Sequence, residues 1–155
     1  MAWRDRLTRM SFETSIRTLD LQVTDVIEFR RAGAGRQQRV HAVINGTELT
    51  QLWHRAAGRW AAPIWSSVLG PSLEWWGPNG KPPPAALSEW VPVGYAPVLT
   101  CRCGDFACGG ALAQIRFDRR LAIWANFKTA KYEKDVPLGP FIFGRRAYEV
   151  ARDAF

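Results

Sequence analysis

The stretch ALAQIRFDRRLAIWANF, residues 111–127, carries the clearest structural signal of the chain. Its two ends, 111–117 and 121–127, are short apolar segments, and a polar Asp-Arg-Arg tripeptide separates them. Two such segments joined by a short polar turn predict two paired β-strands. We therefore predict an antiparallel hairpin here, with Trp124 in the middle of its second strand and in the core.

Further strands are expected on both sides of this hairpin. Residues 17–23 alternate apolar and polar side chains, as a half-buried strand does, and residues 26–29 extend this strand or begin a second one. Residues 39–44 read as the return strand, after a turn that contains two glycines. Short strands are also expected at 97–100 and 141–143.

Two helices complete the predicted elements. Residues 47–58 place apolar side chains three and four positions apart, which is a helical spacing, with Thr47 or Asn45 as the cap and Gly58 at the end. Residues 145–155 show a second such stripe. The fold class expected is α+β: a mainly antiparallel sheet of five or six strands, two short helices and a loop-rich excursion.

The length of 155 residues predicts a single domain, 1–155, with a sizeable core. Disorder of the whole chain is excluded, because 47% of the residues are hydrophobic. No stretch approaches the roughly 18 apolar residues of a membrane-spanning helix. The first ten residues lack the apolar centre of a secretory signal, which predicts a cytoplasmic protein.

The excursion is the segment 59–97, which holds five of the eight tryptophans and eight of the ten prolines. Tryptophan and arginine dominate the energetics of protein interfaces, and a proline-rich chain loses little entropy on binding. Trp75 and Trp76 precede Gly-Pro-Asn-Gly, a turn expected to push at least one indole into solvent. The candidate protein-binding residues are Trp65, Trp75, Trp76 and Arg59.

Three cysteines, Cys101, Cys103 and Cys108, lie in a short glycine-containing loop. Such a loop can bring three sulfurs together for one zinc ion, with His54 among the candidates for the fourth ligand. The C-x-C spacing is atypical of zinc sites, and free thiols packed as small apolar groups explain the loop equally simply. A disulfide is the third alternative, although a reducing cytosol disfavours it.

This loop also carries a resemblance to a known family. The chain resembles a family of small uncharacterised bacterial proteins with a C-x-C-G-x-x-x-C-G loop before a C-terminal Trp/Phe hairpin. The matching residues are Leu99, Thr100, Cys101, Cys103, Gly104, Cys108, Trp124, Phe127, Phe141, Phe143, Tyr148 and Glu149. The resemblance covers about the last third of the chain and implies a shared fold around the loop, without an activity.

The net charge of +7 comes from arginine, with 17 arginines and four lysines against 14 acidic residues. Such a charge attracts acidic partners, whether proteins or nucleic acids. Phosphate contacts dominate affinity for nucleic acids, and the two basic hairpin tips can supply them. The candidate nucleic-acid-binding residues are Arg30, Arg31, Arg36, Arg39, Arg119 and Arg120.

No nucleotide-binding, metalloprotease or hydrolase motif is present in the sequence. The function expected is therefore that of a non-enzymatic binding protein, inhibitor-like or immunity-like, whose partner is an acidic protein. The first alternative is a nucleic-acid-binding protein. The second is a small cysteine-dependent redox or metal protein.

Overall fold

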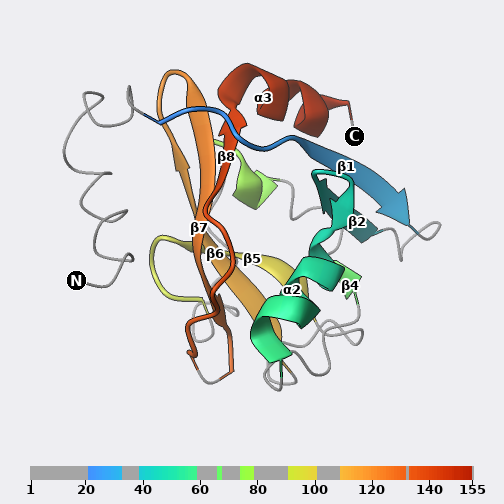
Figure 1. Cartoon of the computed structure of the whole chain (residues 1–155), viewed down its shortest axis with the longest axis vertical. Coiled ribbons are helices and arrows are strands. Elements are labelled where there is room, and N and C mark those ends of the chain that lie inside the picture. The colour runs from blue at the N-terminus through green and yellow to red at the C-terminus, as the bar shows by residue number, and fades with distance from the viewer. Residues whose placement is uncertain are drawn as a thin grey trace.

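The computed structural model describes residues 21–32, 39–58, 66–67, 74–78, 91–100, 109–131 and 133–154. In these ranges the fold is α+β, with two antiparallel sheets and two helices, as expected (Figure 1). The helix α3 (Arg145–Asp153) lies at one end of the five-stranded sheet, and the helix α2 (Leu49–Ala57) lies beside the three-stranded sheet.

The larger sheet has five strands in sequence order, each antiparallel to its neighbours. Its central hairpin confirms the prediction from 111–127, and the Asp118 carboxylate closes the turn by accepting the backbone N–H groups of Arg120 and Leu121, both at 2.7 Å. The strands are β4 (Ser66–Ser67), β5 (Tyr95–Thr100), β6 (Gly110–Phe117), β7 (Leu121–Thr129) and β8 (Phe141–Gly144).

The smaller sheet pairs β1 (Ile27–Ala32) with β2 (Arg39–Ile44), and β2 with β3 (Thr47–Glu48). The expected return strand at 39–44 is confirmed, and its partner β1 confirms the alternative that residues 26–29 begin a second strand. The expected strand at 17–23 is wrong for its described part, since residues 21–23 adopt no strand conformation. These residues belong instead to an irregular segment that crosses between the two sheets and is described below.

The strand count differs from the expected five or six, because the described part of the chain contains eight strands in two sheets. The additional ones are β3 and β4, which have two residues each. A two-residue strand contains a single alternation of inward and outward side chains, whereas a strand is recognised from alternation over about 4–8 residues. Periodicity in the sequence therefore cannot reveal it.

Both helices follow directly on a strand. The helix α2 (Leu49–Ala57) buries Leu49, Trp53 and Ala57, and Gly58 ends it at φ 54°, where glycine is at no disadvantage. Its start corrects the expected cap: Glu48 occupies that position and makes no capping side-chain bond. The helix α3 (Arg145–Asp153) buries Tyr148.

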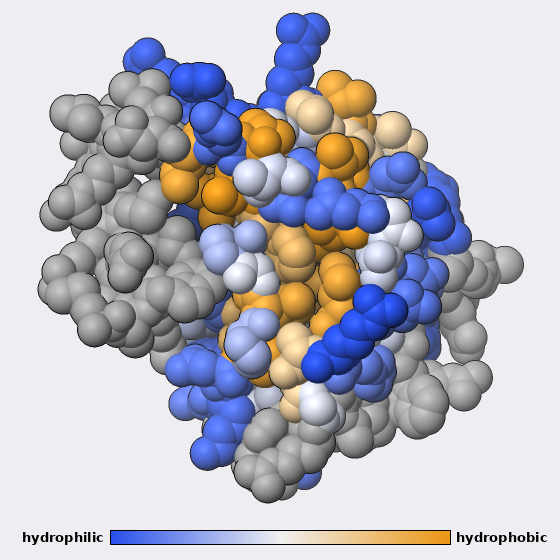
Figure 2. Space-filling model, in the orientation of Figure 1, coloured by the Kyte–Doolittle hydropathy of each residue, from blue (hydrophilic) through white to orange (hydrophobic). Residues whose placement is uncertain are grey.

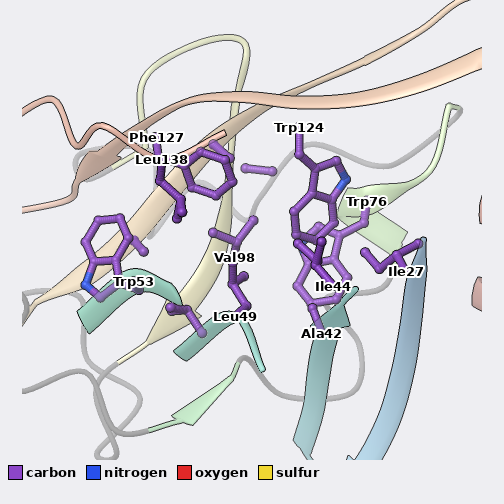
Figure 3. Packing of buried hydrophobic residues seen from close by; sticks show 14 of the residues in the cluster. Ile27, Ala42, Ile44, Leu49, Trp53, Trp76, Val98, Trp124, Phe127 and Leu138 are labelled. Carbon is purple, nitrogen blue, oxygen red and sulfur yellow. The ribbon is translucent and has the colours of Figure 1, made fainter. Parts of the chain in front are cut away.

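The core between the sheets centres on an aromatic group. The rings of Trp76 and Trp124 lie 5.3 Å apart, and both side chains are fully buried (Figure 3). Their polar atoms are satisfied: Trp124 Nε1 donates to Tyr148 Oη at 3.1 Å, which donates to the Trp76 carbonyl at 2.6 Å. Trp76 Nε1 donates to the Pro97 carbonyl at 2.8 Å. Because buried polar groups are costly when unpaired, this network fixes one arrangement of the rings.

A crossing segment, residues 21–26, connects the two sheets. Its Asp25 carboxylate accepts the Ile142 N–H at 2.8 Å from β8 and the Asn45 side-chain amide at 2.7 Å from the β2–β3 turn. Asn45 Oδ1 in turn accepts the Val26 N–H at 2.9 Å. Asp25 therefore joins the last strand of one sheet to the hairpin of the other.

Replacing Asp25 with alanine should lower the free energy of unfolding by about 2 kcal/mol, because a charged acceptor shared by several donors is lost. Urea unfolding followed by circular dichroism measures this. The matched control is Asp153→Ala, whose carboxylate is 73% exposed and should change stability by less than about 0.5 kcal/mol. Equal changes in the free energy of unfolding for both substitutions would show that the Asp25 contacts add no more stability than an exposed carboxylate does.

Candidate functional site

The β6–β7 turn and the start of α3 form one basic surface. Arg145, the first residue of α3, donates its backbone N–H to the Arg120 carbonyl at 2.8 Å and its Nη1 to the Asp118 carbonyl at 2.6 Å. These bonds bring together arginines about 25 positions apart in the sequence. We call Arg119, Arg120, Arg145 and Arg146 the arginine cluster.

Strand pairing explains why the cluster forms. Leu121, at the start of β7, pairs with Gly144, at the end of β8, and α3 begins at the next residue. The turn before β7 and the first turn of α3 must therefore lie side by side. The sequence shows two separate Arg-Arg pairs, and only the β7–β8 pairing joins them.

The cluster keeps an excess of positive charge. Arg145 pairs with Glu149 at 3.2 Å, while the Asp118 carboxylate is occupied by two backbone N–H groups. The side chains of Arg119, Arg120 and Arg146 are exposed, and no ion pair to them occurs among the described residues. The first turn of α3 contains no acidic residue, so the positive end of the helix dipole adds to the charge.

The other predicted nucleic-acid-binding residues lie elsewhere. Arg30 and Arg39 belong to the smaller sheet, where Arg30 pairs with Glu28 at 3.1 Å, and Arg31 is exposed near the end of β1. Arg36 lies outside the described residues. The predicted set is thus divided between two sheets, and Arg119 and Arg120 gain a neighbouring pair that the prediction did not include.

The predicted tryptophan surface requires a correction. Trp76 is 0% exposed and lies in the core, so it cannot contact a partner. Residues 74–76 form a short 3₁₀ turn, which directs Trp76 inward and leaves Trp75 half-buried against the core. Trp65 and Arg59 lie outside the described residues.

Two buried ionisable side chains already have structural partners. Burial raises the pKa of the Tyr148 hydroxyl above its ordinary value, which keeps the group protonated as the donor to Trp76. Lys128 is 4% exposed, lies 4.3 Å from the centre of the Tyr95 ring and pairs with the exposed Glu133 at 3.7 Å. These contacts account for both buried groups without a role in binding or catalysis.

The predicted metal site lies mostly outside the described residues, which do not include Cys101, Cys103 or Cys108. The remaining candidate, His54, lies on the exposed side of α2. Across the described ranges, no group of three or more His, Cys, Asp or Glu side chains is placed to hold a metal ion. Zinc binding at the cysteine loop stays a prediction.

If the loop binds zinc, protein purified without chelator should contain about one equivalent of the metal and lose stability when a chelator is added. Elemental analysis and thermal unfolding with and without chelator measure both effects. A triple Cys→Ser variant at 101, 103 and 108 is the control. Metal-free wild-type protein would leave the free-thiol and disulfide interpretations.

No protein-family model, curated protein or solved structure matches this chain. The resemblance at the cysteine loop therefore stays an expectation from the sequence. Neither of the two described helices has the length and apolar character needed to cross a membrane.

Proposed function

We propose that the protein is a non-enzymatic binding protein of the cytoplasm that engages an acidic protein partner through the arginine cluster. The observation that carries this proposal is the gathering of three exposed arginines, without an acidic partner among the described residues, around the turn that Arg145 holds in place. A guanidinium group binds carboxylates through two parallel hydrogen bonds, which suits an acidic protein surface.

The rigidity of this surface supports the same proposal. Arg119 and Arg120 lie on a turn that is closed by Asp118 and bonded to α3. A binding surface that is already ordered loses less conformational entropy when the partner arrives. The net charge of +7 also accelerates encounter with an acidic partner.

Nucleic acid is the second candidate, because guanidinium groups also bind phosphates. One observation weighs against it. The exposed large apolar side chains of the described part are four valines, Val23, Val26, Val93 and Val150, and none is aromatic. Sequence-tolerant binding of single strands relies on aromatic side chains that stack on bases, whereas aliphatic side chains beside arginines suit a protein contact.

The double variant Arg119→Glu/Arg146→Glu should weaken binding to poly-L-glutamate at low salt at least about tenfold, because two attractions become repulsions. Fluorescence anisotropy measures the affinity. The control with the same change in net charge is Arg30→Glu/Arg55→Glu, on β1 and α2. Its affinity for poly-L-glutamate should fall much less.

Two outcomes would contradict the proposal. Equal losses in both double variants would show attraction by net charge alone, without a defined surface. Tighter binding to single-stranded or duplex DNA than to poly-L-glutamate, with a salt dependence that the Arg119/Arg146 variant reduces, would favour the nucleic-acid candidate.

A further inference from the structure

We propose that the arginine cluster recognises an acidic protein segment with aliphatic anchors, which pack against Val23 and Val150 while its carboxylates bind the arginines. This inference rests on the proposed function and specifies its partner. The partner is an amphipathic acidic segment, which should bind more tightly than a segment that carries only negative charge.

Val23 lies beside Gly144, which directly precedes Arg145 of the arginine cluster. Its Cγ2 atom is 3.8 Å from the position that a Cβ atom would occupy on Gly144, the residue that precedes α3. Gly144 pairs with Leu121, and Arg120 and Arg145 adjoin these two residues. Val23 nevertheless remains 54% exposed. An aliphatic group that stays in solvent next to several arginines can contribute binding energy when a partner covers it.

Val150 places a second aliphatic group near the cluster. It lies four residues after Arg146, on the same face of α3, and is 61% exposed. Two of the four exposed valines therefore adjoin the arginine cluster. Isolated exposed aliphatic residues are ordinary on protein surfaces, so their position beside exposed arginines that form no ion pair within the described part of the chain is the informative observation.

The arrangement of the elements agrees with this placement. Residues 21–26 pass in front of β7 and β8, close to the start of α3 (Figure 1). In the same orientation, hydrophobic residues reach the surface on this face, with hydrophilic residues beside them at the top and right of the view (Figure 2). Leu21 and Ile142 are half-buried and pack on the apolar residues Leu121, Ile123 and Ala125 of β7.

Charge complementarity selects the occupant. A second copy of this chain carries the same net charge of +7 and would be repelled. A nucleic-acid backbone supplies the negative charge but offers no aliphatic side chain to cover the valines. An acidic segment with leucine or isoleucine among its carboxylates supplies both.

Two synthetic peptides of equal length and charge test the inference on the full chain. Both contain glutamate throughout, and one has leucine at two positions where the other has serine. Fluorescence anisotropy at low salt should show the leucine peptide binding wild-type protein about tenfold more tightly, the effect of partly burying aliphatic groups. Val23→Ser and Val150→Ser should each reduce this preference without changing the affinity for the serine peptide.

Val93→Ser is the matched control, because Val93 is fully exposed on a turn before β5 and should leave the preference unchanged. Circular dichroism verifies that each variant is folded. If both peptides bind equally, the inference is wrong and the proposed function stands. If neither peptide binds, both are wrong. Tighter binding of a DNA oligonucleotide than of the leucine peptide would replace the protein segment with nucleic acid.

Discussion

Replacing Trp76 with alanine should lower the free energy of unfolding by about 3–5 kcal/mol, a large share of the roughly 5–15 kcal/mol that keeps a domain folded. The indole is fully buried, stacks on Phe29 and meets the Trp124 ring edge-on. The substitution would leave a cavity and also remove the donor to the Pro97 carbonyl. Urea unfolding followed by circular dichroism measures the change.

The neighbouring Trp75→Ala substitution is the matched control. Trp75 is half-buried and only packs against the edge of the core, so its loss should cost about 1 kcal/mol and leave the protein folded. A Trp76→Ala variant as stable as Trp75→Ala would contradict the placement of Trp76 in the core. A partner contact by Trp75 remains a prediction, which a binding titration on this folded variant tests.

The second large effect is expected for Trp124→Ala, again about 3–5 kcal/mol. Trp124 is fully buried on β7, contacts Trp76, Phe143 and Tyr148, and donates to the Tyr148 hydroxyl. Loss of its indole would leave a cavity where the strand, α3 and the 74–76 turn meet. Thermal and urea unfolding of the variant measure the loss.

Two further variants bracket the expected effect of Trp124→Ala. Trp124→Phe keeps an aromatic ring but not the indole N–H, so its stability should fall between those of wild type and Trp124→Ala. Val150→Ala, at a 61% exposed position, should change stability by less than about 0.5 kcal/mol. If Trp124→Ala is as stable as Val150→Ala, the indole of Trp124 does not organise the core.

The elements with a long and regular pattern could be predicted from the sequence. The hairpin at 111–127 follows from its two apolar segments around a polar turn, and the helix α2 follows from apolar side chains at helical spacing that the structure buries. The return strand at 39–44 and the C-terminal helix are also confirmed, although Tyr148 is the one residue of 145–153 that α3 buries. Trp76 could not be placed in this way. Gly77 and Pro78 after it favour a turn, but a turn can direct a side chain inward as easily as outward.

The arginine cluster illustrates a different limit of prediction from the sequence. Both Arg-Arg pairs are plain in the sequence, yet each alone is typical of a solvated surface. Their proximity depends on the pairing of Leu121 with Gly144 and on the Arg145 bonds to the β6–β7 turn. Such contacts between distant segments leave no local signal, so one sequence cannot reveal the assembled surface.

The position of Asp25 has a consequence for the order in which the chain folds. Strands β5 to β8 pair with their neighbours along the chain, so they can associate early with short loops to close. The bond from the Ile142 N–H to Asp25 instead spans 117 positions and carries a larger loop-closure cost. We expect a contact of this kind to form late, after the transition state. Loss of the Asp25 carboxylate therefore acts mainly by accelerating unfolding, while the folding rate changes little.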